Sequence, residues 1–346
     1  MSWYDYILFL FGISWAMVGM YRWYAIDKGI IDTPNDRSSH SVPTARGGGI
    51  VFSFATAMLL GALYYYKLLT VTQAIYFVPA FLISILGYID DRRGLSSSLR
   101  FVVHFLCAGA FLLLIKEGGT LLQEWINLPL PINFFLLTFM IVWTINLFNF
   151  MDGTDGIATL EAIFCLTVGG YILYQAKAYE LATFAWGIVA ILSGFLTWNW
   201  PVAKLFMGDS GSGFLGMLIV TFALLSYKLF QIPILIWVIL LSMFWFDATV
   251  TLIRRMLAKE KWYAPHRKHA YQRIVQSGWT HQQLLFATIP INIVLSGLAL
   301  WAYRTPELIY VALGFAVILL TCVYILVEIA KPMYRTWHTD RSQVET

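Results

Sequence analysis

The chain has 346 residues, of which 59% are hydrophobic and only 12% are charged, and its mean hydropathy is +0.70. So few charged residues cannot cover the surface of a water-soluble protein of this length, and a formal net charge of +4 gives no reason to expect a nucleic-acid partner. The composition therefore indicates a polytopic membrane protein.

Long apolar segments recur along the whole chain. Lipid offers the backbone no hydrogen bonds, and these segments do not alternate with polar residues as barrel strands do, so we expect helices. About 20 apolar residues are needed to cross a bilayer. On that criterion the fold is all-α, a single membrane domain over residues 1–346, with about eleven transmembrane helices predicted at 3–23, 49–66, 70–89, 99–115, 133–149, 157–175, 180–198, 211–227, 231–253, 284–303 and 307–329.

The loops between the predicted helices fall alternately on the two sides of the membrane. One side holds five of the 23 Lys and Arg residues, and the other side holds the remaining 18; the five are Lys67, Lys116, Lys177, Lys228 and Arg304. Because cytoplasmic loops are enriched in Lys and Arg, the second side is expected to face the cytoplasm. The polar motifs described next all emerge on that side.

The first of these motifs is the loop 32–49, which combines cations, hydroxyl groups and a glycine run before the second predicted helix. Arg37, Arg46 and the glycine-rich helix start are suited to bind phosphate. Glycines at a loop-to-helix junction are also common punctuation, so this loop alone is a weak signal.

Two carboxylates, Asp90 and Asp91, directly follow an apolar run, and a third, Asp209, lies in the glycine-rich segment 206–213. The pair could be a polar stop that Arg92 and Arg93 neutralise. Small polar residues at a helix start are usually caps. A cap does not explain three glycines beside a carboxylate that lies at the same depth as another pair, and we interpret Asp209 as part of a site.

A row of amides and carboxylates occupies the end of the fifth predicted helix. Asn146, Asn149 and Asp152 are spaced by three and share one helix face, and Asp155 continues the row if the helix continues. Facing lipid, each would cost several kcal/mol, so the row is expected to line a cavity or to form a polar seam between helices.

The last motif is the loop 265–273, in the long segment 254–283, which has room for a short surface helix. It contains His266, Arg267 and His269. A basic loop of this kind can bind substrate or can lie on anionic lipid headgroups.

Lys204 precedes the Asp209 segment and is a candidate phosphate contact or an interfacial anchor. Asp247 and Arg254 are two helical turns apart, which favours pairing between them through an intermediary.

In order and spacing, these motifs resemble those of the polyprenyl-phosphate N-acetylhexosamine-1-phosphate transferases, glycosyltransferase family 4, which include the MraY and WecA enzymes. The family pattern has an early Pro-Thr-x-Arg-Gly-Gly loop, an Asp-Asp pair, an Asn-x-x-Asn-x-x-Asp-Gly-x-Asp-Gly segment, a Phe-Met-Gly-Asp-x-Gly-Ser segment and a histidine-bearing loop. All five occur here between about residue 32 and residue 273.

The resemblance implies ten or eleven transmembrane helices, a UDP-N-acetylhexosamine donor, undecaprenyl phosphate as acceptor, and release of UMP. It also implies dependence on Mg2+, with Mn2+ as the alternative, and a multi-pass location in the bacterial inner membrane with the active site facing the cytoplasm. Membrane lipid and a second copy of the chain, as a homodimer, complete the expected partners. Mg2+ prefers hard oxygen ligands, and one or two carboxylates suffice when a diphosphate supplies the rest.

By the same resemblance, Asp209 is expected to be the principal metal ligand, with Asp90 and Asp91 as partners. His266 or His269 takes the catalytic histidine role, and the sequence does not decide between them. Asn146, Asn149, Asp152 and Asp155 match the nucleoside side, Phe206 matches an aromatic that stacks on uracil, and the remaining expected substrate contacts are Thr44, Arg46, Lys204 and Arg267.

Two departures from the family pattern narrow the branch. Ala45 stands where many relatives have proline, and the histidine loop reads His-Arg-Lys-His-Ala-Tyr-Gln. That loop is most similar to the branch that starts O-antigen and related polysaccharides. The alternatives are the phospho-N-acetylmuramoyl-pentapeptide transferases of peptidoglycan synthesis and, in a different class, a transporter. Transporters place polar residues near the midplane, whereas here they gather at helix ends.

Overall fold

The computed structural model describes residues 2–34, 42–116, 128–261, 264 and 266–334. Fourteen α-helices form nearly all of this part of the chain. They are α1 (Trp3–Asp27), α2 (Gly49–Tyr65), α3 (Val71–Ile75), α4 (Val78–Arg93), α5 (Ser97–Ile115), α6 (Leu130–Met151), α7 (Ile157–Gln175), α8 (Tyr179–Asn199), α9 (Asp209–Phe230), α10 (Ile234–Leu240), α11 (Ser242–Leu257), α12 (Ala270–Gln276), α13 (His281–Arg304) and α14 (Ile309–Ala330).

The all-α prediction is confirmed. In the part of the chain that the structure describes, nine helical segments are long and apolar enough to cross a membrane, and α10 with α11 forms a further candidate bent by 76°. Helix α2 has 17 residues and is shorter than these segments. Each of the eleven predicted spans coincides with a helix or a broken pair of helices. Of the described helices, nine are long and apolar enough to cross a membrane, or ten if the bent pair is one span.

Helix α9 is the centre of the bundle. Its residues from Ser210 to Ser226 are all buried, and it contacts α2, α4, α6, α7 and α10. The outer helices differ: only 22% of the apolar window of the last segment, 306–330, is buried, and α1 is similarly exposed. Lipid covers such apolar faces, so their exposure agrees with a membrane bundle.

Two glycines let α2 and α4 pass directly against the first turn of α9. A Cβ at Gly49 would lie 2.1 Å from the backbone N of Gly211, and a Cβ at Gly87 would lie 2.3 Å from the carbonyl O of Asp209. Since both neighbours are backbone atoms, only glycine fits. Two glycines of the Asp209 segment are packed in the same contacts, because a Cβ at Gly211 would lie 2.8 Å from Phe52 and a Cβ at Gly213 would lie 2.8 Å from Ile83.

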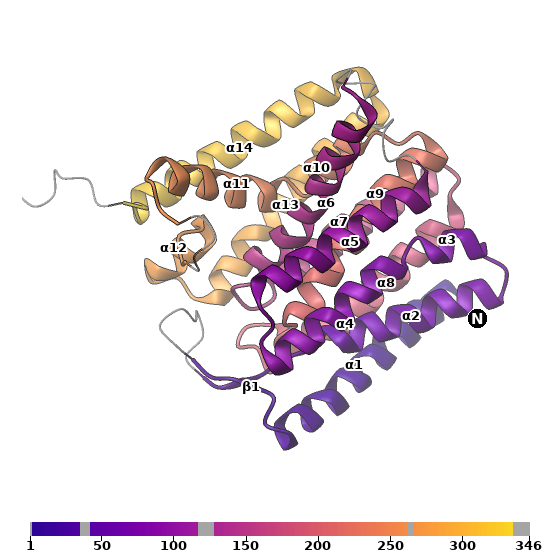
Figure 1. Cartoon of the computed structure of the whole chain (residues 1–346), viewed down its shortest axis with the longest axis horizontal. Helices are drawn as coiled ribbons and strands as arrows, with labels where there is room; N and C mark the ends of the chain where they lie inside the picture. The colour runs from indigo at the N-terminus through magenta and orange to yellow at the C-terminus, as the bar shows by residue number, and fades with distance from the viewer. Residues whose placement is uncertain (1, 35–41, 117–127, 262–263, 265, 335–346) are drawn as a thin grey trace, which may run out of the picture.

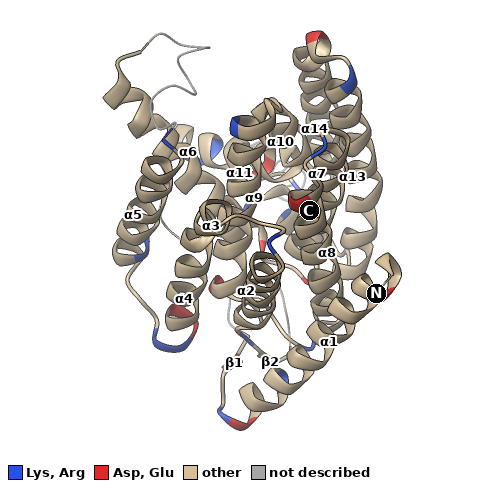
Figure 2. Ribbon diagram, turned by 90° about the vertical axis from the view of Figure 1, so that its right-hand side faces the viewer, with Lys and Arg blue, Asp and Glu red and all other residues tan. Residues whose placement is uncertain are grey.

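The polar loops lie at one end of the bundle. Figure 1 shows β1 (Ile31–Asp32) and α12 at the left-hand end, and α3 and the amino terminus at the opposite end. Strand β1 pairs antiparallel with β2 (Thr44–Ala45), and a parallel bridge joins Ala45 to Leu205. In Figure 2 the charged residues colour mainly the helix ends and the loops. The predicted motifs therefore meet on one face of the molecule.

Candidate active site

Three carboxylates and two guanidinium groups meet where α4, α5 and α9 end or begin. We call Asp90, Asp91, Asp209, Arg46 and Arg100 the acid–arginine cluster. Arg46 Nη2 lies 2.8 Å from Asp91 Oδ1 and 3.4 Å from Asp209 Oδ1. Arg100 Nη1 lies 2.7 Å from Asp90 Oδ2 and 2.5 Å from Asp209 Oδ2. The four cluster residues predicted from sequence do come together, and Arg100 joins them.

Asp91 holds the start of α9. Its carboxylate accepts hydrogen bonds from the backbone N–H of Asp209 at 2.9 Å and of Ser210 at 3.2 Å, and its side chain is fully buried. A carboxylate at a helix amino terminus satisfies unpaired N–H groups and matches the helix dipole. Asp91 therefore fixes the position of Asp209, and both of its oxygens already have partners.

Asp90 and Asp209 each direct an oxygen at the same nitrogen of Arg100. Asp90 also accepts a hydrogen bond from the backbone N–H of Leu95 at 2.5 Å, which ties it to the turn before α5. The sequence analysis missed Arg100 as a site residue. A usable signal was present: Ser96 caps the helix that follows the Asp pair, which puts Arg100 in the first turns of that helix, close to the carboxylates.

The Asn146 row divides at the end of α6. Asn149 Nδ2 donates to Asp209 Oδ1 at 3.0 Å, whereas Asn146 Nδ2 donates to Val142 O in its own helix. The helix ends at Met151, so the row does not continue, and Asp152 is the capping residue beyond it. Burial raises the pKa of the Asp152 carboxyl, and the neighbouring carboxylates of Asp209 and Asp91 act in the same direction.

Asp155 lies outside the helix and contacts another loop. Its Oδ2 accepts the backbone N–H of Ala203 at 3.0 Å and lies 3.2 Å from Nδ1 of His281, the first residue of α13. Asn199 acts nearby: its Oδ1 accepts the N–H of Gly156, and its amide donates to Leu205 O. These contacts place the loop 200–208 between α7 and α13.

That loop also pairs with the segment that carries Thr44 and Arg46. Phe206 N donates to Ala45 O at 2.8 Å, and Gly48 N donates to Phe206 O at 2.9 Å. Phe206 is half-buried, and Lys204 is exposed with its Nζ 6.0 Å from the Trp198 ring centroid. Thr44 is buried, and its hydroxyl donates to Val42 O. Phe206 and Arg46 are thus carried by two segments that hydrogen-bond to each other.

The two histidines have different surroundings. His269 is buried, and its Nδ1 lies 3.6 Å from Asp247 Oδ1. Asp247 also accepts the N–H groups of Ala270 and Tyr271 at 2.8 and 3.1 Å, so it caps the start of α12. The prediction that Asp247 pairs with Arg254 is wrong, because Arg254 binds Glu328 instead.

His266 is half-buried, and its ring centroid lies 4.8 Å from that of His269. Its Nδ1 accepts the N–H of Lys268 at 3.2 Å, so in the neutral ring the proton is on Nε2. Burial lowers the pKa of His266 to about 4, and the charge of Arg255 acts in the same direction. Arg267 is half-buried, and its carbonyl accepts from Gln276.

The cluster suits a divalent cation chemically. Within the described residues, no three Asp, Glu, His or Cys side chains already form a metal site. Asp90 Oδ2 and Asp209 Oδ2 nevertheless both face the same guanidinium nitrogen, so these two carboxylates are the residues that would hold such a cation. Hard oxygen donors of this kind, completed by phosphate and water, are the ligands Mg2+ prefers.

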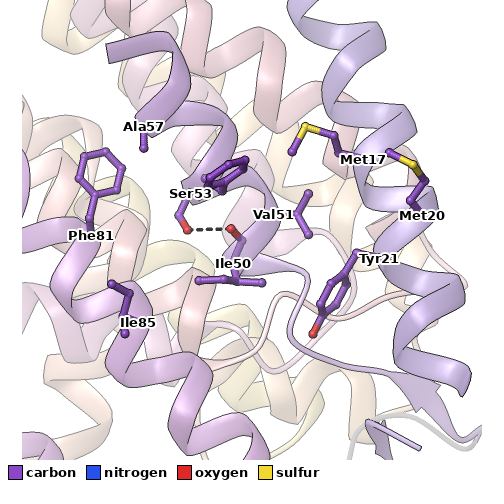
Figure 3. A pocket seen from close by; sticks show the side chains of 10 residues that line it. Met17, Met20, Tyr21, Ile50, Val51, Ser53, Ala57, Phe81 and Ile85 are labelled. Atoms are coloured by element: carbon purple, nitrogen blue, oxygen red, sulfur yellow. Dashed lines mark hydrogen bonds between the residues drawn. The ribbon is translucent and has the colours of Figure 1, made fainter. Parts of the chain in front are cut away.

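An apolar cavity of about 430 Å³ lies next to the loop that carries Arg46, because its lining residue Tyr21 donates from its hydroxyl to the Arg46 carbonyl at 3.2 Å. Its lining comes from α1, α2 and α4, and Figure 3 shows that Met17, Met20 and Tyr21 close one side while Phe81 and Ile85 close the other. The lining has no charged residue. This cavity therefore does not provide the phosphate chemistry that the acid–arginine cluster is suited to.

These features define a helical membrane protein with a polar site of carboxylates and guanidinium groups at one end of the bundle. Residues 73–227 match the model of glycosyl transferase family 4. A probable undecaprenyl-phosphate N-acetylglucosaminyl 1-phosphate transferase of Bacillus subtilis is 29% identical, over 79% of this chain and 77% of that protein.

Two further relatives have related names. The undecaprenyl-phosphate alpha-N-acetylglucosaminyl 1-phosphate transferase of Yersinia pestis is 27% identical over 80% of this chain and 78% of its own. The decaprenyl-phosphate N-acetylglucosaminephosphotransferase of Mycolicibacterium smegmatis is 27% identical over 88% of this chain and 84% of its own. The family prediction made from the motifs is confirmed.

Proposed function

We propose that this protein transfers an N-acetylhexosamine 1-phosphate, or a 6-deoxy relative, from a UDP-sugar to undecaprenyl phosphate and releases UMP. The product would start a lipid-linked surface polysaccharide such as O-antigen at the cytoplasmic face of the bacterial inner membrane. The observation that carries the proposal is the convergence of Asp90 and Asp209 on Arg100, beside Arg46, at the end of the bundle. The names of the relatives support the same reaction class.

In the proposed reaction an oxygen of the acceptor phosphate bonds to the sugar-linked phosphorus of the donor. The bond from that phosphorus to the bridging oxygen breaks, and UMP leaves with the electron pair. Arg46 and Arg100 neutralise the charge that spreads over the phosphoryl oxygens, which is the main task in phosphoryl transfer. Mg2+ bound by Asp209 and Asp90 would add Lewis-acid stabilisation of the same oxygens.

We assign the nucleoside half of the donor to the end of α6 and to the loop 200–208, which lie beside Asp209. Asn149 and Asp152 lie at the end of α6 beside the cluster, and Phe206 supplies a half-buried ring for stacking on uracil. Lys204 and Arg267 are exposed or half-buried cations at the same end of the bundle. Asp155 serves this half indirectly, because it holds the backbone of the loop that carries Phe206.

The proposal is tested by UMP release in membranes that contain the full chain. The donors are UDP-N-acetylglucosamine, UDP-N-acetylfucosamine and UDP-N-acetylmuramoyl-pentapeptide, each offered with undecaprenyl phosphate and with Mg2+ or a chelator. We expect Mg2+-dependent UMP and lipid-linked sugar phosphate with a simple N-acetylhexosamine or its 6-deoxy relative. The Asp209→Asn variant, which loses an anionic oxygen, should have no turnover.

Two results would contradict the proposal. Preference for the muramoyl-pentapeptide donor would move the chain to the peptidoglycan branch. The absence of UMP release with every donor, from protein that is folded in detergent, would reject the reaction class.

A further inference from the structure

The short helix α12 is held at three places, and α12 itself lies beyond residue 227, where the match to the family model ends. Asp247 caps its first residues, and Tyr271 donates from its hydroxyl to Phe150 O at the end of α6. At the far end, Arg273 reaches Glu328 on α14. The family match ends at residue 227, so the motifs of the matched region give no role to this last contact.

Glu328 receives two arginines from two different elements. Arg254, near the end of α11, forms a bidentate pair with it at 2.6 and 2.9 Å. Arg273 Nη1 lies 2.6 Å from the same Oε2. Planar bidentate pairs of this kind fix direction as well as distance. One carboxylate therefore joins α11, α12 and α14, three elements that also pack on one another near the left-hand end in Figure 1.

Arg273 depends strongly on this partner. Its side chain is only 2% exposed, and among the described residues its Nε and Nη2 atoms have no hydrogen-bond partner. Its Nη1 binds Glu328 and the carbonyl of Lys331, and its guanidinium carbon lies 5.0 Å from the Tyr324 ring centroid. A buried charge that loses its counter-ion is strongly destabilising. Without the Glu328 carboxylate, α12 would have to move to bring Arg273 to water.

Such a movement would reach the histidines directly. His269 is the residue immediately before α12, and the two histidine rings are in contact. Tyr271, in the first turn, faces Gly153, where a Cβ would meet its hydroxyl at 2.1 Å. The short helix thus fits closely against the end of α6 and the segment that follows it. A displacement at Arg273 would change this fit, and the end of α6 also carries Asn149, which donates to Asp209.

We infer that Glu328 is a positioning residue that aligns α12, and with it His266 and His269, for phosphoryl transfer. This inference rests on the proposed function for its kinetic consequence, and on geometry alone for its structural one. A displacement of a catalytic group by about 1 Å can cost on the order of 100-fold in rate.

The test compares Glu328→Gln, Glu328→Asp and Glu307→Gln in purified full-length protein. Glu328→Gln removes the charge, while Glu328→Asp keeps it on a shorter side chain. Glu307→Gln is the matched control, because Glu307 is exposed beyond the other end of α14. The readouts are amide hydrogen exchange in α12 and α9, and kcat and KM with UDP-N-acetylglucosamine or whichever UDP-sugar proves active.

We expect faster exchange in α12 but unchanged exchange in α9 for Glu328→Gln, with partial recovery in Glu328→Asp and wild-type behaviour in Glu307→Gln. We also expect kcat to fall by about tenfold or more. The KM for the donor should stay within about threefold of the wild-type value, because most of the proposed donor contacts lie in and around the acid–arginine cluster. Unchanged α12 exchange, or exchange that rises equally throughout the bundle, would overturn the inference. So would a wild-type kcat with a loosened α12. If the wild-type protein releases no UMP, the proposed function fails, while the exchange measurement still decides whether Glu328 positions α12.

Discussion

Tyr271 and Asn149 act on opposite sides of one residue. The Tyr271 hydroxyl donates to the carbonyl of Phe150 at 2.8 Å, and the preceding residue, Asn149, donates to Asp209 at 3.0 Å. The end of α6 therefore lies between the histidine loop and the acid–arginine cluster. Asp209 and Tyr271, which are 62 residues apart in sequence, thus contact adjacent residues of one helix turn.

Substitution of Tyr271 by Phe tests this connection. The change removes one hydrogen bond and leaves the Phe150 carbonyl unpaired, which should lower the free energy of unfolding by about 1–3 kcal/mol. Turnover should also fall, because Asn149 lies in the last turn of α6 and would move with it, away from Asp209. Tyr64→Phe, at an exposed position in α2, is the control and should leave both unchanged. Thermal unfolding in detergent and UMP release measure the two effects, and equal Tm values for the two variants would contradict this account.

The close passage of α4 against α9 gives a second prediction. Gly87→Ala would place a Cβ 2.3 Å from Asp209 O and 2.5 Å from Ser210 N, so the start of α9 must shift. Overpacking of this kind costs about 1–3 kcal/mol or more, and it displaces Asp209, so turnover should be nearly lost.

Gly61→Ala is the matched control for the same chemical change. A Cβ at Gly61 meets nothing within 4 Å, and alanine is favoured over glycine in a helix by about 1 kcal/mol. The control should therefore be as stable as the wild-type protein or more so. Circular dichroism melts and UMP release compare the pair, and a Gly87→Ala protein with normal activity would show that the helices do not approach so closely.

The helices and the meeting of the motifs at one end could be predicted from sequence, because long apolar runs and alternating loops constrain a membrane bundle strongly. The roles within the site could not. Asp90 and Asp91 are adjacent in sequence, yet one caps α9 and the other faces Arg100. Asp155 continues the three-residue spacing of Asn146, Asn149 and Asp152, but α6 ends at Met151, so Asp155 does not share their helix face. These roles depend on where each helix ends and on the direction of each side chain, and neither can be predicted from the spacing of the residues in the sequence.

Arg100 provides a prediction about catalysis. Arg100→Ala removes the cation between Asp90 and Asp209 and one group that neutralises phosphoryl charge. Loss of such a group should lower turnover by about 100- to 1,000-fold. Arg93→Ala is the control, because Arg93 is exposed at the end of α4. UMP release is measured on protein that elutes as a folded species, and an Arg100→Ala rate within a few-fold of wild type would remove Arg100 from the site.

The sidedness of the bundle can be tested by labelling single cysteines. Ser96 and Lys177 are exposed and lie in turns at opposite helix ends, after α4 and after α7. Gly118, the second labelling site that the sequence-based topology offers, lies outside the described residues, whereas Lys177 lies on the same predicted side of the membrane. In right-side-out vesicles an impermeant maleimide should label Lys177→Cys and leave Ser96→Cys unlabelled. Labelling of both variants from one side would refute the alternating topology.

The histidine loop gives a prediction about pH. Burial lowers the pKa of His266 to about 4, well below the ordinary value near 6.5. Between these two values the unfolded chain binds a proton that the folded loop does not. The neutral ring therefore stabilises the fold fully above about pH 6.5, and this contribution is lost as the pH falls toward 4.

Glu260 does not add to the change in that pH range. Hydrogen bonds from Lys268 and Arg255 outweigh its burial and lower the pKa of Glu260 to about 2, so it stays ionised. Thermal unfolding should therefore show a decline between pH 6.5 and pH 4 that is smaller in His266→Gln, where the titrating group is absent. The two proteins are compared in the same detergent at each pH. Parallel pH profiles for wild type and His266→Gln would mean that His266 titrates normally and that its ring is not buried by this loop.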